Sequence, residues 1–142
     1  MFREPTQKHI LIVEDESDLR DSLKVSLKIS GYAVTTTENS AEALRRLPDI
    51  QPDLILLDIL TESMDAGLFM QRLRNLPSEL KHTKVIVLTN LDDSETRAKM
   101  EQHGIEAYLV KINVSLQDIL DSIDVALLPI SDTDGKPPTL EL

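Results

Sequence analysis

Four short apolar runs in this sequence each end in polar side chains that are able to do chemistry. The runs and the residues after them are Ile10–Val13 before Glu14-Asp15-Glu16, Leu54–Leu57 before Asp58, Val85–Leu88 before Thr89-Asn90, and Ala107–Val110 before Lys111. Carboxylates, a hydroxyl and an ammonium group together suit the binding of a phosphoryl group, where catalysis is mainly positioning and neutralisation of charge. One carboxylate of such a set can act as the nucleophile and become an aspartyl phosphate.

The carboxylates also predict a metal ion. If the first and third runs are neighbouring strands, Glu14, Asp15 and Asp58 meet in one pocket. At about 5 Å and an effective dielectric near 20, each pair of carboxylates repels by roughly 3 kcal/mol. A hard divalent cation offsets this repulsion, and oxygen ligands suit Mg²⁺. Lys111 would add a fixed positive charge and Thr89 a hydroxyl donor.

Each of these residues, taken alone, has an ordinary structural explanation. An aspartate at a strand end, such as Asp58 or Asp15, is usually a helix cap or a solvated loop residue. Thr89 alone is usually a turn residue, and Lys111 alone usually lies on the surface. Asp92-Asp93 is better explained as a helix cap than as a second metal site. The joint occurrence at successive strand ends favours the phosphoryl site.

The segments between the runs have helical spacing and predict the elements that position these residues. The expected helices and their limits are Leu19–Leu27 before Gly31, Ala41–Leu47 capped by Asn39-Ser40 and ended by Pro48, Phe69–Leu76 ended by Pro77, and Leu116–Leu127 capped by Ser115 and stopped by Pro129. Asp93–His103 is the weakest, with only Ala98 and Met100 as apolar anchors, and we expect a shallowly docked helix there.

A fifth, β-branched run at Ala33–Thr37 completes a pattern of strand and helix repeated five times. Such alternation predicts an α/β fold with a parallel sheet and helices on both faces. Strands buried on both faces read as continuous apolar runs, as Leu54–Leu57 and Val85–Leu88 do. In open sheets of this kind the site lies at the carboxyl ends of the strands.

Composition limits the class of protein. The chain has 142 residues, 41% of them hydrophobic, a net charge of −10 and no cysteine. These values predict one soluble, cytoplasmic domain without disulfides, and they argue against direct contact with nucleic acid. No apolar run approaches the length of a membrane span, and no P-loop or dinucleotide fingerprint is present. We expect a short extension at residues 1–8, a domain at 9–128 and a flexible tail at 129–142.

Over about residues 8–128 the sequence resembles the receiver domains of two-component response regulators. The matching stretches are HILIVEDE at 9–16, DLILLDILTESMD at 53–65, VIVLT at 85–89 and YLVK at 108–111. The resemblance implies a doubly wound, flavodoxin-like fold, with a five-stranded parallel sheet in the order 2-1-3-4-5 and helices on both faces.

The resemblance also implies a role for each acidic residue of the site. Asp58 would be the phosphoacceptor and a ligand of Mg²⁺. Asp15 would bind the ion directly, and Glu14 would bind it largely through water. The backbone carbonyl of Leu60 would be a further metal ligand.

Three more residues acquire roles through the resemblance. Thr89 and Lys111 would contact the phosphoryl oxygens, and the rotamer of Tyr108 would be coupled to Thr89 as a switch. Two neighbours depart from the family pattern. Asn90 replaces a very small residue, and Ile112 replaces a proline whose peptide bond is commonly cis. Because a cis bond before a residue other than proline costs about 2.5–4 kcal/mol, we expect a trans bond and a reshaped loop.

The partners implied are a sensor histidine kinase or a histidine phosphotransfer protein as the phosphoryl donor. The protein would be a signalling phosphoacceptor that assists its own phosphorylation and dephosphorylation, rather than an enzyme acting on a separate substrate. No effector domain follows in the sequence, so we expect a stand-alone receiver. Its output to a downstream protein would then pass through protein contact, homodimerisation or onward phosphotransfer, without a membrane contact.

Two alternatives stay open. The first is an interaction module that uses the receiver fold without phosphorylation; Asn90 and Ile112 favour it, and the complete acidic, threonine and lysine set disfavours it. The second is a small phosphatase. It is weaker because Asp58-Ile59-Leu60-Thr61 lacks the second aspartate typical of haloacid-dehalogenase-type phosphatases.

Overall fold

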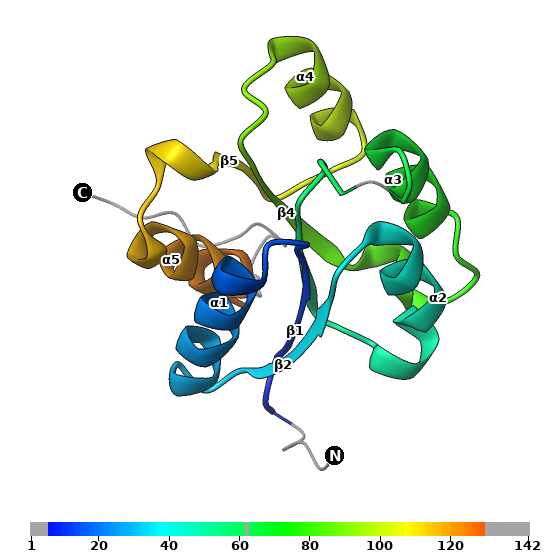
Figure 1. The fold of residues 1–142 in the computed structure, drawn as a ribbon. Coiled ribbons are helices and arrows are strands. Elements are labelled where there is room, and N and C mark those ends of the chain that lie inside the picture. The colour runs from blue at the N-terminus through cyan, green and yellow to red at the C-terminus, as the bar shows by residue number, and fades with distance from the viewer. Residues whose placement is uncertain (1–5, 62, 130–142) are drawn as a thin grey trace.

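The computed structural model describes residues 6–61 and 63–129, and the predicted extension and tail fall mostly outside this range. Five strands form one parallel sheet in the order β2-β1-β3-β4-β5 (Figure 1), as predicted. The strands are β1 (His9–Val13), β2 (Ala33–Thr37), β3 (Leu54–Leu57), β4 (Lys84–Thr89) and β5 (Ala107–Val110).

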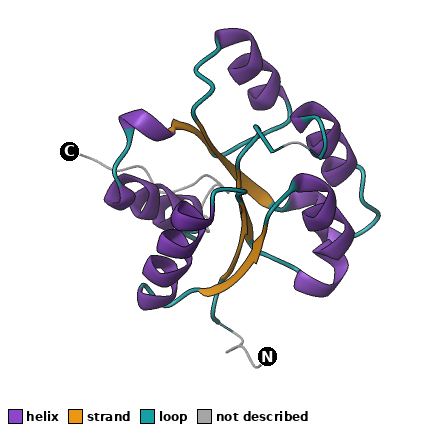
Figure 2. Cartoon of the chain, in the orientation of Figure 1, coloured by secondary structure: helices purple, strands orange, loops and turns teal. Residues whose placement is uncertain are grey.

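Helices cover both faces of the sheet (Figures 1 and 2). They are α1 (Ser17–Ile29), α2 (Ser40–Ile50), α3 (Ala66–Arg74), α4 (Ser94–Gln102) and α5 (Leu116–Ala126), with the short 3-10 helices η1 (Glu79–His82) and η2 (Lys111–Asn113). Helices α1 and α5 lie on one face, and α2, α3 and α4 lie on the other. Within the described ranges, every helix is too short or too polar to cross a membrane.

The strands contribute to two cores because successive side chains point to opposite faces of a sheet. In β1, Leu11 and Val13 pack into the core beneath α2, α3 and α4, whereas Ile10 and Ile12 pack toward α1 and α5. All four side chains are fully buried. Burial on both faces accounts for the continuous apolar runs in the sequence, and it fixes the register that brings the strand ends together.

Several predicted caps are present. The side chain of Asn39 accepts a hydrogen bond from the Glu42 N–H and begins α2. Ser115 and Asp118 form a capping box at the start of α5. Asp93 accepts a hydrogen bond from the Thr96 N–H and begins α4, which confirms its interpretation as a helix cap. Each cap satisfies backbone N–H groups that have no partner inside the helix.

The prediction that Pro48 ends the second helix was wrong. Helix α2 continues through Pro48 to Ile50 and ends where Gln51 adopts a left-handed conformation with φ of 49°. The missing N–H of Pro48 removes one hydrogen bond of the helix, and the helix continues for two further residues. The next helix, α3, ends at Arg74, before Pro77, and the unpredicted η1 follows.

Helix α4 is shallowly docked, as predicted, but through fewer apolar anchors. Met100 is buried, whereas Ala98, the other expected anchor, is exposed. The predicted trans bond after Lys111 is confirmed, since the described residues contain no cis peptide bond. The chain there forms η2, and the side chain of Ile112 is 81% exposed.

Helix α5 runs from the carboxyl ends of the strands, the carboxyl edge of the sheet, to their amino ends, the amino edge. It begins just after Lys111 at the carboxyl edge and runs back toward the amino edge. There the Lys84 ammonium, at the start of β4, donates a 2.5 Å hydrogen bond to the Ala126 carbonyl. The Tyr32 hydroxyl, just before β2, donates to the Asp124 carboxylate. The last turn of α5 is thus held at the amino edge of the sheet.

Candidate active site at the carboxyl edge of the sheet

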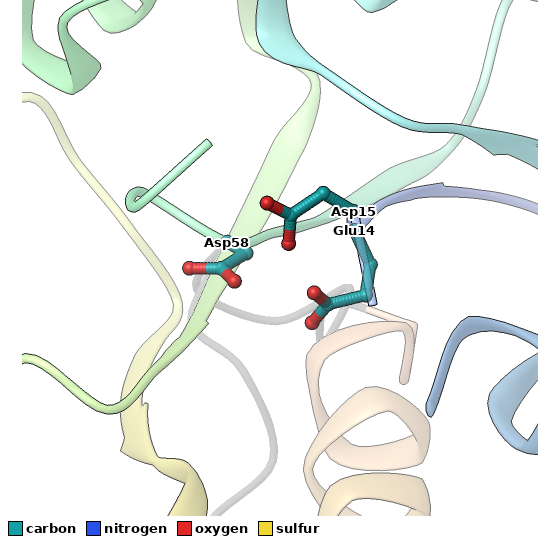
Figure 3. A group of neighbouring side chains, drawn as sticks. All are labelled: Glu14, Asp15 and Asp58. Atoms are coloured by element: carbon teal, nitrogen blue, oxygen red, sulfur yellow. The ribbon is translucent and has the colours of Figure 1, made fainter. Parts of the chain in front are cut away.

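Three carboxylates gather where β1 and β3 end (Figure 3). The two strands pair with Val13 opposite Leu57, so Glu14 and Asp58 follow at equivalent positions. The Asp58 N–H donates to the Val13 carbonyl at 3.0 Å and extends the pairing by one residue. Glu14, Asp15 and Asp58 each have a carboxylate oxygen within 4.8 Å of the others. The structure therefore brings together the acidic residues that the sequence grouped.

Lys111 reaches this cluster from the end of β5. Its ammonium nitrogen lies 2.7 Å from Glu14 Oε1 and 3.0 Å from Asp58 Oδ2. The remaining oxygens of these two carboxylates accept backbone N–H groups: Glu14 Oε2 accepts from Glu16 at 3.1 Å, and Asp58 Oδ1 accepts from Leu60 at 2.9 Å. Both buried carboxylates are thereby fixed in orientation by one side-chain donor and one backbone donor.

Burial and charge act in opposite directions on these groups. Burial raises the pKa of Glu14, although its hydrogen bonds from Lys111 and the Glu16 N–H act to lower it. Burial disfavours the charged form of Lys111, but its hydrogen bonds to Glu14 and Asp58 outweigh this and raise the pKa of its ammonium group. Lys111 therefore stays protonated and supplies a permanent positive charge beside Asp58.

The donor set fits Mg²⁺. The three candidate ligands are carboxylates, which are the hard oxygen donors this ion prefers. Glu14 and Asp58 are buried, whereas Asp15 is exposed, so the cluster is open to water on one side. An ion that keeps several of its waters suits a site with one open side. The side chain of Leu60, whose carbonyl was the predicted backbone ligand, is half exposed, and its N–H is bonded to Asp58.

Thr89 lies at the same edge, at the end of β4. The pairing of Thr89 with Val110 places it beside the residue that precedes Lys111. Its side chain is fully buried, and its Oγ1 accepts a 3.2 Å hydrogen bond from the Leu91 N–H. The Tyr108 hydroxyl donates to the Leu91 carbonyl at 2.5 Å, so one residue connects the predicted pair.

Two contacts of the site were not predicted. Leu91 links Thr89 to Tyr108 through its backbone N–H and carbonyl, and a backbone link leaves no mark on residue type. Arg20 of α1 donates to the carbonyls of Glu14 and Asp15 at 3.0 and 3.4 Å and so fixes the turn after β1. Its spacing of six residues from Glu14 is the one signal for this contact in the sequence, and it is weak.

Comparison with known proteins identifies the family. The family model of the response regulator receiver domain matches residues 10–124, which is most of the chain. The chain belongs to this family. Similarity to solved structures agrees: a CheY-like receiver domain protein from Methanospirillum hungatei has a TM-score of 0.76 and 28% identity, covering 84% of this chain and 92% of that one. The chemotaxis response regulator CheY4 of Vibrio cholerae has a TM-score of 0.77 and 25% identity, covering 86% of this chain and 100% of that one.

Curated relatives of this receiver domain are longer proteins. The transcriptional regulatory protein PrrA of Mycobacterium tuberculosis is 34% identical over 106 residues, which cover 75% of this chain and 44% of PrrA. The response regulator MprA of a Mycobacterium species, strain KMS, is 29% identical over 126 residues, or 53% of its length. The chain thus spans about half the length of the curated relatives it matches.

Proposed function

We propose that this receiver domain accepts a phosphoryl group on Asp58 in the cytoplasm, in a reaction that depends on Mg²⁺. The observation that supports this most directly is the Lys111 ammonium, 3.0 Å from Asp58 Oδ2, within a cluster of three carboxylates. The donor would be the phosphohistidine of a sensor histidine kinase or of a histidine phosphotransfer protein. An oxygen of Asp58 forms the new P–O bond as the P–N bond of the donor breaks.

The side chains around Asp58 have complementary tasks in this transfer. Lys111 neutralises charge that develops on the phosphoryl oxygens, and the Thr89 hydroxyl donates a hydrogen bond to one of them. The Leu60 N–H holds Asp58 Oδ1 at 2.9 Å and so orients the nucleophile. The same residues assist the later transfer of the phosphoryl group from Asp58 to water, because charge develops on the same phosphoryl oxygens in that step.

A bound Mg²⁺ would neutralise negative charge shared between the carboxylates and the phosphoryl group. Asp15 and Asp58 would be direct ligands, Glu14 would act largely through water, and the Leu60 carbonyl would complete the protein ligands. The mutual approach of the three carboxylates within 4.8 Å supports this set, since Lys111 supplies one positive charge against three carboxylates.

Output follows from a change in a surface that other proteins contact. Thr89 and Tyr108 are linked through Leu91, and Tyr108 belongs to β5, between α4 and α5. We propose that phosphorylation alters this face and its affinity for a downstream protein or a second copy of the chain. The transcriptional role of relatives such as PrrA rests on proteins about twice as long, so the nature of the output is part of the proposal.

The test is incubation with acetyl phosphate and Mg²⁺, followed by intact-mass measurement. We expect one phosphoryl group per chain in the wild type and none in Asp58→Asn. Asp21→Asn, which changes an exposed carboxylate of α1, serves as the matched control and should be phosphorylated normally. Chelation of the metal should abolish the adduct.

The outcomes separate the proposed function from its alternatives. A wild-type protein that gains no adduct, although it is folded, would contradict the phosphoacceptor role and favour a phosphorylation-independent interaction module. Catalytic turnover of a generic phosphomonoester, rather than a single transfer to the protein, would instead revive the phosphatase hypothesis.

A further inference from the structure

Helix α4 is held to the domain by few side chains. Met100 is its one buried residue. On the exposed part of the helix, the Arg97 guanidinium lies over the ring of Tyr108, 5.5 Å from the ring centroid. A cation within about 6 Å of an aromatic face is attracted to it by the ring quadrupole. This contact joins α4 directly to β5.

Arg97 is itself held in place. Its Nε lies 3.1 Å from Glu101 Oε1, one turn further along the same helix. Both side chains are more than half exposed, so this ion pair contributes little to stability. Its effect is on geometry, because it removes rotational freedom from the guanidinium that lies over Tyr108.

Beyond Tyr108 the contacts continue to the phosphoryl site. Tyr108 is 7% exposed, and its hydroxyl donates to the Leu91 carbonyl at 2.5 Å. The Leu91 N–H donates to Thr89 Oγ1 at 3.2 Å. This bond uses an acceptor lone pair of the Thr89 hydroxyl and leaves its single proton for another acceptor. The inward position of Tyr108 thus coincides with a Thr89 hydroxyl that is ready to donate.

We propose that Arg97 is a positioning residue that keeps Tyr108 inward and, through Leu91, keeps the Thr89 hydroxyl oriented toward an incoming phosphoryl group. The part that concerns Thr89 rests on the proposed function, whereas the part that concerns Tyr108 does not. By this arrangement, a protein that engages Arg97 or Glu101 on the surface of α4 changes the reactivity of Asp58. The coupling also runs from the site to the surface, because linkage between two sites is reciprocal.

The first measurement concerns Tyr108 alone and needs no phosphorylation. The chain has two tyrosines and no tryptophan, so Tyr108 becomes the sole fluorophore of this kind in the Tyr32→Phe background. In that background Arg97→Gln should raise the ratio of outward to inward tyrosine about two- to fivefold, the factor expected for an exposed cation–π contact. Increased quenching of tyrosine fluorescence by acrylamide would report this change.

The matched control is Lys99→Gln, which removes the same charge from the same helix. Because Lys99 lies beside Gly67 of α3, Lys99→Gln should leave the quenching of Tyr108 unchanged. Arg97→Lys keeps a cation and should restore most of the shielding of Tyr108. Unchanged quenching in Arg97→Gln, or an equal increase in Lys99→Gln, would overturn the proposal.

The second measurement is the initial rate of phosphorylation by acetyl phosphate and Mg²⁺. We expect Arg97→Gln to slow this rate, by at most the same two- to fivefold factor, and Arg97→Lys to restore it. Altered quenching at an unaltered rate would overturn the link to Thr89. Altered quenching in a protein that is never phosphorylated would support the positioning of Tyr108, and it would contradict the proposed function instead.

Discussion

At the scale of the residue, hydrogen bonds hold the carboxylates of the site close together although their charges repel one another. Glu14 and Asp58 each bond to Lys111 and to one backbone N–H. Asp15 adds a third carboxylate within 4.8 Å without sharing Lys111. One ammonium group therefore faces three negative charges, and the cluster is destabilised unless a cation binds. Such local cost is common where function needs an arrangement that stability alone would not select.

Asp15→Asn should therefore stabilise the metal-free protein. Removing one exposed charge from the cluster relieves repulsion by about 1 kcal/mol, a value reduced by solvent screening. Urea unfolding without metal measures this as a higher midpoint at an unchanged slope. Asp18→Asn, in the first turn of α1, is the control and should lack the gain. A lower midpoint for Asp15→Asn would contradict the repulsion argument.

Tyr32 gives a prediction about pH. Burial and the hydrogen bond to the Asp124 carboxylate raise the pKa of the Tyr32 hydroxyl above its usual value of 10.0. The folded protein thus keeps this proton where the unfolded chain loses it. The stabilisation is fully present below about pH 10 and is lost as the pH rises through the raised pKa.

Absorbance titration of phenolate in the wild type and in Tyr32→Phe isolates this group by difference. We expect the folded protein to ionise Tyr32 above pH 10 and the protein in urea to ionise it near pH 10. At neutral pH, Tyr32→Phe should lose about 1 kcal/mol of stability. An unshifted titration in the folded protein would show that the hydrogen bond to Asp124 is absent in solution.

At the scale of the element, the ends of α3 and α4 are tied together by a single side chain. The Arg74 guanidinium donates to four carbonyls, at 2.7–3.0 Å, which belong to Lys81, Thr83, His103 and Gly104. These carbonyls lie in the segment from η1 to β4 and in the turn between α4 and β5. Arg74 thereby holds two loops that sequence periodicity does not describe.

Arg74→Met should destabilise the protein by about 2–4 kcal/mol, since it leaves four carbonyls without their donor while keeping most of the aliphatic length. Urea unfolding measures the loss. Arg72→Met changes an exposed arginine of the same helix and should stay within about 0.5 kcal/mol of the wild type. Equal urea midpoints for the two variants would show that the hydrogen bonds from Arg74 do not stabilise the fold.

The elements also show what the sequence was able to predict. Five strands and five helices followed from apolar runs and helical spacing, and the caps Asn39, Asp93 and Ser115 followed from residue type. The end of α2 did not, because a proline in a last turn removes one hydrogen bond and packing decides whether the helix continues. Helix η1 and the contacts of Arg74 depend on tertiary structure and have no periodic signal.

At the scale of the whole molecule, the parallel sheet brings the residues of the site together because its strands end at the same edge. Residues separated by up to 97 positions, Glu14 and Lys111, meet because β1, β3 and β5 all end at one edge. The grouping of Glu14, Asp15, Asp58 and Lys111 could be predicted from the strand ends. The role of Leu91 could not, since it acts through backbone atoms whose positions only the folded chain defines.

Mg²⁺ should stabilise the whole domain. An ion that binds the folded carboxylate cluster and not the unfolded chain adds about 1.4 kcal/mol at ten times its dissociation constant. Thermal unfolding should therefore shift upward with millimolar Mg²⁺ in the wild type. The shift should vanish in Asp15→Asn and persist in Asp18→Asn. A melting temperature of the wild type that is indifferent to the ion would contradict the proposed metal site.

The anchoring of α5 also separates its last turn from the phosphoryl site, because the two lie at opposite ends of the strands. The helix has eleven residues and carries the chain about 16 Å away from the edge that holds Asp58. Lys84 and Tyr32 fix its last turn on that far side. A donor protein that docks over Asp58 would therefore approach the opposite ends of the strands from those that hold the last turn of α5.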